Sequence, residues 1–161
     1  MKPENQDMFD FDQLRKNMYL FANNVNTGDV GNYLASFALY QVNDIIDTDF
    51  DAIIKECLGK QAGLAATRSI TSREILDDVR QALEYKGDDG SHPNRNYLSG
   101  DQSAVDIDEI LDQLDSLCTS AEVLAEIRLK DWHPFYPVFW DFAFLFVLKE
   151  RAIVFIGSSS D

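Results

Sequence analysis

The sequence predicts an α+β protein that is predominantly helical and ends in an antiparallel β-hairpin packed against the helices. Over most of the first 130 residues, apolar side chains recur at intervals of three and four, which is typical of amphipathic helices. Near the end, Phe139–Leu148 and Ala152–Ile156 are almost continuously aromatic or branched, which is typical of buried strands. At 161 residues, 45% of them hydrophobic, the chain can bury one core, so we expect a single domain over 1–161.

Three helices are expected in the first part of the chain. The apolar spacing predicts a helix over 10–25, which the polar and glycine residues after it end. Asp29 is a suitable N-cap for a second helix with an apolar face from Val30 to Tyr40. The stretch "NDIIDTDFDAIIKE" (43–56) predicts a third helix that ends near Gly59.

Three more helices are expected before the hairpin. Thr71 to Glu74 form a capping-box sequence that opens a helix ending near Gly87. Residues 87–104 are rich in glycine, aspartate, serine and asparagine, which predicts a flexible loop that is either disordered or in contact with a partner. A helix over 107–117 follows, and a second capping-box sequence, 119–122, predicts another helix that runs to about Leu129.

The hairpin is expected to turn at Lys149–Arg151 and to be covered on both faces, because its apolar runs do not alternate with polar residues. Two strands alone are marginally stable, so helices must pack on them, and Tyr136–Val138 or a partner could add a further strand. Asp141, inside the apolar run, is expected to pair with Lys149 or Arg151. Ser158–Ser160 are expected to form a frayed polar tail.

Charge is the strongest functional signal in the sequence. The net charge is −14, from 28 acidic and 14 basic residues, which disfavours direct binding to nucleic acid or membranes and favours a basic protein partner. No lysine or arginine occurs between Asn17 and Ile54 or between Asn96 and Ile127, so the acids are segregated. We expect the partner to bind acids of these two blocks, with Asp44, Asp47 and Asp51 on one helix face. The candidate partner-binding residues are Asp44, Asp47, Asp49, Asp51, Asp106, Asp108, Glu109, Asp112 and Asp115.

Recognisable catalytic and metal-binding motifs are missing from the sequence. Asp47, Asp49 and Asp51 match the first ligand positions of an EF-hand, but Ala52 and Leu58 replace the required glycine and glutamate. No nucleophile elbow, phosphate-binding loop, dinucleotide fingerprint or zinc motif occurs, so we predict no enzyme activity, no metal and no cofactor.

Other residues leave alternatives open. An enzyme that uses Asp131, His133 and Asp141 with a metal or a water remains possible from the sequence. The aromatic stretch "WHPFYPVFW" (132–140) fits either core packing or an exposed interface anchor. Cys57 and Cys118 are expected to be reduced thiols, with one disulfide as the alternative. No signal peptide or membrane span is visible, so we expect a cytoplasmic protein.

In size, acidity and lack of catalytic motifs the chain resembles bacterial immunity proteins, which neutralise toxins of the colicin or contact-dependent growth inhibition type. The resemblance lies in the acidic stretches "NDIIDTDFD" and "DIDEILDQLD" and in the C-terminal "WDFAFLFVL…AIVFIGSSSD". It implies stoichiometric inhibition of a basic toxin domain, such as a nuclease, and no individual residue role. On this reading, changing Asp47 and Asp51 to lysine slows association with the toxin. An adaptor or nucleic-acid mimic that binds a nucleic-acid-binding protein is the alternative.

Overall fold

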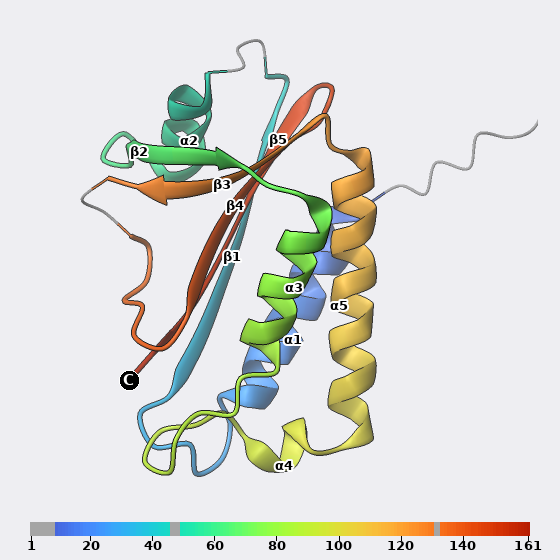
Figure 1. Cartoon of the computed structure of the whole chain (residues 1–161), viewed down its shortest axis with the longest axis vertical. Helices are drawn as coiled ribbons and strands as arrows, with labels where there is room; N and C mark the ends of the chain where they lie inside the picture. The colour runs from blue at the N-terminus through green and yellow to red at the C-terminus, as the bar shows by residue number, and fades with distance from the viewer. Residues whose placement is uncertain (1–8, 46–48, 131–132) are drawn as a thin grey trace, which may run out of the picture.

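A computed structural model describes residues 9–45, 49–130 and 133–161 of the chain. Its centre is a five-stranded antiparallel sheet with the strand order β1-β5-β4-β3-β2 (Figure 1). The strands are β1 (Leu34–Asn43), β2 (Leu64–Ser69), β3 (Val123–Leu129), β4 (Asp141–Val147) and β5 (Arg151–Ser160). The helices are α1 (Phe11–Val25), α2 (Phe50–Leu58), α3 (Ser72–Leu83), α4 (Arg95–Leu98) and α5 (Asp101–Ser120).

This architecture corrects the predicted fold class. The protein is α+β, but helices do not predominate, and the strands are spread through the chain instead of being confined to a C-terminal hairpin. The predicted hairpin exists as β4 and β5, and it forms the middle of the sheet. Its outer neighbours are β1, from the first third of the chain, and β3, so neither Tyr136–Val138 nor a partner supplies the adjacent strands.

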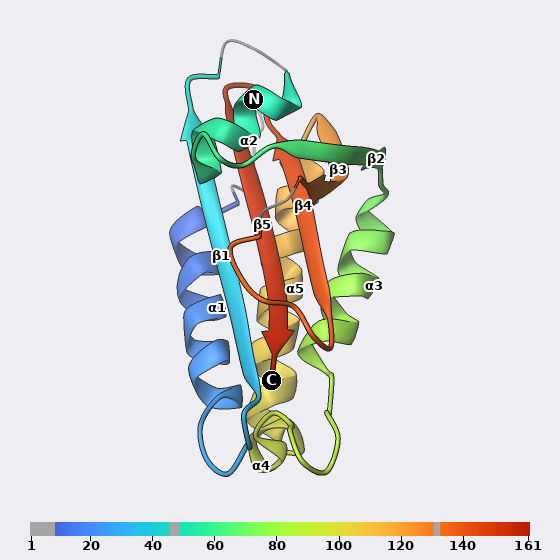
Figure 2. The ribbon, with the colours of Figure 1, turned by 90° about the vertical axis from the view of Figure 1, so that its left-hand side faces the viewer.

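Helices cover both faces of the sheet. The helices α1, α3 and α5 lie on one face, and α5 lies farthest from the strands (Figure 1). The short helix α2 lies on the opposite face near one end of the sheet, and the segment 133–140 crosses that same face (Figure 2). The core accordingly has two parts, one between the sheet and the three helices and the other between the sheet and α2.

The alternating direction of the side chains along the central strands explains why the sequence of these strands is continuously apolar. Phe142, Phe144 and Phe146 of β4 face the three-helix layer, whereas Leu145 and Val147 pack in the α2 part of the core. Because side chains of a strand point alternately to opposite faces, a strand covered on both faces needs apolar residues at every position. The expectation that both faces of the hairpin are covered is therefore confirmed.

The helix predicted from Val30 to Tyr40 is wrong, because this segment forms β1. Its apolar spacing fits a helix, but it also fits a strand in which Ala35, Phe37 and Leu39 face the three-helix layer. Tertiary pairing decides between the two: β1 pairs with β5 from Leu34 to Asn43 without a break in register. Local periodicity could not reveal that partner, which is more than 100 residues away.

The second predicted capping box is also wrong. Residues 119 and 120 belong to the last turn of α5, and β3 begins at Val123. The hydroxyl of Thr119 donates to the carbonyl of Asp115, and that of Ser120 donates to the carbonyl of Ser116. These hydroxyls therefore bond backwards into the helix that is ending instead of capping a new one. By contrast, the Thr71–Glu74 capping box is confirmed at the start of α3.

At the C-terminus, the predicted frayed tail is part of β5. Ser158 and Ser159 are buried, and Ser159 donates its N–H to the carbonyl of Trp140. The predicted Asp141 ion pair is wrong as well. Asp141 is exposed and lies opposite Ser158, at the far end of the hairpin from Lys149, whereas Arg151 donates to Oε1 of Gln41.

Part of the predicted 87–104 loop is ordered into α4 and the start of α5. The rest is held by backbone hydrogen bonds: His92 N–H donates to the carbonyl of Val30, and Asn94 N–H donates to that of Val25. The Asp88 carboxylate accepts from the N–H groups of Gly90 and Ser91. This segment therefore fastens the C-terminal end of α1, and the turn after it, to the start of α4.

Candidate functional site

The two acidic blocks of the sequence lie on opposite sides of the sheet. The first block ends in α2, whose apolar side packs with Ile53 and Ile54 against one face. The second forms α5, whose apolar side packs with Ile110 and Leu114 in the other part of the core. The candidate residues that the structure describes therefore do not form one continuous surface.

In the first block, the carboxylates are used to build the local fold. The expected helix face of Asp44, Asp47 and Asp51 does not form, because Asp44 lies in a turn with φ of 57° and α2 begins only at Phe50. Asp47 lies outside the described residues. Asp49 is the N-cap of α2, and its carboxylate accepts the N–H of Asp51.

Asp51 has two partners inside the protein. Its carboxylate accepts the N–H of Leu64 at 2.9 Å, which ties α2 to the start of β2, and it lies 2.8 Å from Nζ of Lys55. The bond from Lys55 and the N–H of Leu64 lower the pKa of Asp51, and the same ion pair raises the pKa of Lys55. Asp51 is therefore engaged by its own chain.

In the second block, most carboxylates point to solvent. Asp101, Asp108, Glu109, Asp112 and Asp115 are exposed on α5 and lie on the side of the helix away from its buried residues. We call these five residues the α5 acidic stripe. Because α5 is the helix farthest from the sheet, the stripe forms an outer surface of the molecule (Figure 1). Val105, which is 50% exposed, lies within it.

Few bases neutralise this stripe. Arg80 of α3 approaches Asp108 at 3.7 Å but lies closer, at 3.2 Å, to Glu84. In the part of the chain that the structure describes, no lysine or arginine forms an ion pair with Glu109, Asp112 or Asp115. The stripe therefore presents carboxylates whose charge is open to an incoming cation.

Asp106 lies off the stripe and is engaged internally. It accepts the hydroxyl of Tyr97 at 2.5 Å and the amide of Gln102 at 2.8 Å. Burial, together with this hydrogen bond to the carboxylate, raises the pKa of Tyr97. Asp106 therefore helps to fix α4 against α5.

A shallow groove between α3 and α5 adjoins the stripe. It has a volume of about 400 Å³, and Asp77 and Leu76 of α3 face Asp112 and Asp115 of α5 across it. Arg73 and Arg80 of α3 also line the groove. Arg73 lies 3.9 Å from Asp77 on its own helix, and Arg80 lies between Glu84 and Asp108. Carboxylates with an apolar floor suit the long aliphatic stem and charged head of an arginine or lysine.

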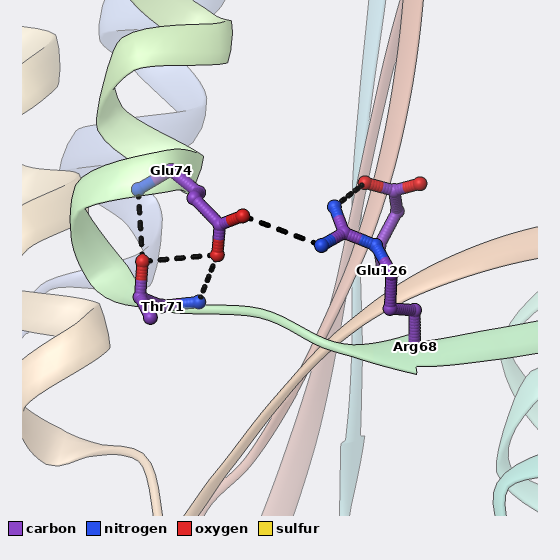
Figure 3. Close-up of polar contacts among 4 residues, drawn as sticks. All are labelled: Arg68, Thr71, Glu74 and Glu126. Carbon is purple, nitrogen blue, oxygen red and sulfur yellow. Dashed lines mark hydrogen bonds and ion pairs between the residues drawn. The ribbon is translucent and has the colours of Figure 1, made fainter.

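One group of acids away from α5 is neutralised by a neighbouring base. Figure 3 shows Arg68 of β2 between Glu74 of α3 and Glu126 of β3, at 3.3 and 2.9 Å. Glu74 also accepts the N–H and hydroxyl of Thr71, which lowers its pKa, and the two carboxylates raise the pKa of Arg68. This cluster fastens β2, α3 and β3 together, whereas Glu109, Asp112 and Asp115 of the α5 acidic stripe have no such base among the described residues.

Of the three residues named for a possible enzyme, Asp131, His133 and Asp141, the structure brings two to the same cleft. Asp141 and His133 both line a cleft of about 630 Å³ between β3, β4 and the segment after Lys130, together with Glu126 and Arg128. Nδ1 of His133 lies 2.8 Å from the carbonyl oxygen of Phe135, on its own segment. Asp131 lies outside the described residues. In the described ranges, no three His, Cys, Asp or Glu side chains are grouped so that they could hold a metal ion.

The aromatic stretch 132–140 divides between the two expected roles. Phe139 and Trp140 pack against the core, and the indole N–H of Trp140 donates to the hydroxyl of Tyr33. Tyr136 is 81% exposed at the rim of the cleft. Sequence alone could not separate the packed rings from the exposed one, because the separation depends on where this segment crosses the sheet.

The two cysteines are free thiols in different parts of the core. Cys118 of α5 is buried in the three-helix layer, and Cys57 of α2 is half-buried on the opposite face. Burial raises the pKa of Cys57 to about 11 and that of Cys118 to about 12. The alternative of a disulfide between them is therefore wrong, and both thiols are poor nucleophiles.

Comparison with known proteins assigns no family: no family model, curated protein or solved structure matches the chain. Among the helices that the structure describes, none is both long and apolar enough to cross a bilayer.

Proposed function

We propose that the protein binds a basic protein domain through the α5 acidic stripe, and that this domain is a toxin, such as a nuclease, which the protein neutralises as a bacterial immunity protein. The observation that carries the proposal is the placement of Glu109, Asp112 and Asp115. They lie on the outermost helix, exposed, and without an ion pair among the described residues.

Electrostatics favours this use of the stripe. Asp112 has Asp108 and Asp115 four and three residues away on the same helix face, and like charges at this spacing cost about 0.2–0.5 kcal/mol per pair. A basic surface docked on the stripe would remove that repulsion. With a net charge of −14, the protein would attract such a surface at a distance and speed the encounter to about 10⁸ M⁻¹s⁻¹ at low salt.

Retention after the encounter needs apolar contact as well as charge. Val105 offers an exposed apolar side chain inside the stripe, and Leu76 and Leu111 line the groove between α3 and α5 beside it. A nuclease presents arginines and lysines where it binds phosphate, so covering them with this surface would block its substrate without any chemical step by the inhibitor. Inhibition would then be stoichiometric.

We place this activity in the cytoplasm. The free thiols of Cys57 and Cys118 are typical of a reducing compartment. A toxin that attacks nucleic acid acts in the same compartment, so the inhibitor would meet it there.

Growth rescue tests the proposal directly. The product of the reading frame next to this gene is expressed from an inducible promoter, alone and together with the present protein. The proposal predicts that the neighbouring product arrests growth, that co-expression restores it, and that the two proteins copurify in a fixed ratio. A neighbouring product that is harmless, or that stays toxic during co-expression, would contradict the immunity function.

The same experiment distinguishes the immunity function from the alternative of an adaptor or nucleic-acid mimic, because only the immunity function requires that the neighbouring product be toxic. A mimic would bind a nucleic-acid-binding protein whether or not that protein is toxic. Rescue that is lost in Glu109→Lys/Asp112→Lys but kept in Glu56→Lys/Glu150→Lys would tie neutralisation to α5, because the second pair makes the same charge change with exposed residues outside α5.

A further inference from the structure

The two edges of the sheet are built differently. The edge strand β2 has six residues, an irregular register between Leu64 and Ala66, and a charged residue, Arg68, held by Glu74 and Glu126. Short length, bulges and charges are the usual devices that keep an edge from pairing with another strand. The β2 edge is therefore protected.

The edge strand β1 has none of these devices. It has ten residues, pairs with β5 without a bulge, and contains neither proline nor a charged residue. The uncharged stretch extends from Val30 to Asn43. A long, regular and uncharged edge is a template for another strand.

Hydrogen bonding shows which backbone groups of β1 face outward. The side chain of Asn26 donates to the carbonyl of Ala35 and accepts the N–H of Ala35, both at 2.8 Å. Since Asn26 is not part of the sheet, the backbone groups of Ala35 point away from β5. Bonding direction alternates along a strand, so those of Phe37, Leu39 and Gln41 also point outward.

These outward groups are open. Asn26 satisfies Ala35, but within the residues that the structure describes no hydrogen bond to the outward N–H or carbonyl of Phe37, Leu39 or Gln41 is formed. In Figure 2, β1 forms the border of the sheet, with α1 behind it. A strand could therefore be added along residues 37–41.

We propose that the added strand is β1 of a second copy of this chain, so that the protein forms a two-fold symmetric dimer with one continuous sheet. An antiparallel pair centred on Leu39 places Phe37 of one copy opposite Gln41 of the other. This register satisfies the outward groups of Phe37, Leu39 and Gln41 in both copies, and it stops at Ala35, where Asn26 already occupies the backbone.

Charge and apolar exposure both favour a second copy at this edge. Two chains of charge −14 repel each other and can meet only where local charge is low. Residues 11–43, which contain both α1 and β1, carry Asp12 and Asp29 against Arg15 and Lys16, so this part of the chain is neutral.

Exposed apolar side chains also occur on α1 and β1. Of the large hydrophobic residues described as exposed, Tyr19 (67%) and Leu20 (48%) lie on α1 and Leu34 (48%) lies on β1. A two-fold axis perpendicular to the joined sheet places both α1 helices on the same side of it, so Tyr19, which lines a groove with Phe37 and Leu39, lies near the dimer border. Since the β2 edges are protected, assembly stops at two copies.

Sedimentation equilibrium of the full chain from 1 to 300 µM tests this proposal. We expect a reversible dimer of twice 18.3 kDa that tightens as salt screens the mutual repulsion. The key variant is Gln41→Pro, which removes an outward N–H, with Gln41→Ala as the matched control for loss of the side-chain bond from Arg151. Gln41→Pro should weaken the dimer at least tenfold relative to Gln41→Ala.

A second pair of variants keeps the test valid if Gln41→Pro fails to fold. Ala38→Lys puts a charge on the β1 edge and should weaken the dimer, whereas Ala66→Lys adds the same charge on the β2 edge and should not. A monomer at every concentration would overturn the proposal. So would a dimer that responds equally to both members of each pair, because its contact would then lie elsewhere.

Discussion

The segment 44–51 and the helix α5 are both rich in aspartate, but the fold uses the described aspartates of the two in different ways. Asp49 caps α2, and Asp51 joins α2 to β2 and to Lys55. On α5, by contrast, Glu109 and Asp112 are exposed and have no ion pair among the described residues. Whether a carboxylate is available to a partner therefore depends on the N–H groups and bases that the fold brings to it, and acidity of the sequence does not reveal these.

Removing Asp51 should give the largest change in stability. In Asp51→Ala the N–H of Leu64 loses its acceptor and Lys55 loses its partner, so we expect the midpoint of thermal unfolding to fall by about 5 °C. Asp112→Ala, on α5, should leave the midpoint unchanged or slightly higher. Differential scanning calorimetry of the two variants checks this, and an equal fall in both would remove the distinction between the segments.

Removing the N-cap should have the next largest effect. In Asp49→Ala the N–H of Asp51 at the start of α2 loses its side-chain acceptor, and such a loss costs about 1 kcal/mol. Chemical denaturation measures the free energy of unfolding, and Asp49→Asn, which can still cap, is the control. If both variants had the same free energy of unfolding as the wild type, Asp49 would not be acting as a cap.

The free energy of unfolding at low pH should also depend on Asp51. Its pKa is lowered from the usual 3.8, so its stabilising contribution is present above that pH and is lost as the pH falls through the lower, folded-state value. Asp51→Asn lacks this titration. The difference in unfolding free energy between wild type and Asp51→Asn should therefore shrink as the pH falls below 3.8, and a constant difference between pH 6 and 2.5 would contradict the assignment.

Charge reversal on α5 should have the smallest effect, and of opposite sign. Asp112 has acidic neighbours at positions 108, 109 and 115, so Asp112→Lys replaces repulsion by attraction and should stabilise the protein by about 0.5–1 kcal/mol. Urea denaturation at low salt measures this gain, which 0.5 M NaCl should reduce. A loss of stability would indicate that Asp112 has a structural role.

The sequence predicted those helices and strands whose state is determined by residues within the same segment. Helix α1, the capping box of α3, most of α5 and the β4–β5 hairpin follow from spacing, caps and composition within each segment. It missed β1, β2 and β3, because their strand state is set by pairing with distant segments. β1 in particular has a spacing that also fits a helix, and only its register with β5 decides the matter.

The candidate site was predictable as a composition but not as a surface. Glu109, Asp112 and Asp115 could be identified from the spacing of apolar residues in α5, which predicts the face opposite the core. Asp51 could not be excluded in the same way, because its acceptor role toward Leu64 depends on how the chain returns after α2. The engagement of Asp106 by Tyr97 likewise depends on α4, which the sequence did not predict.

The most direct test of the central claim is the association rate of the purified product of the neighbouring gene with this protein, measured by stopped flow between 50 and 500 mM NaCl. We predict that Glu109→Lys/Asp112→Lys slows association at least tenfold at low salt and flattens its salt dependence. Glu56→Lys/Glu150→Lys, with the same net charge, should stay close to wild type. Equal rates for the two double variants would contradict the assignment of the binding surface to α5.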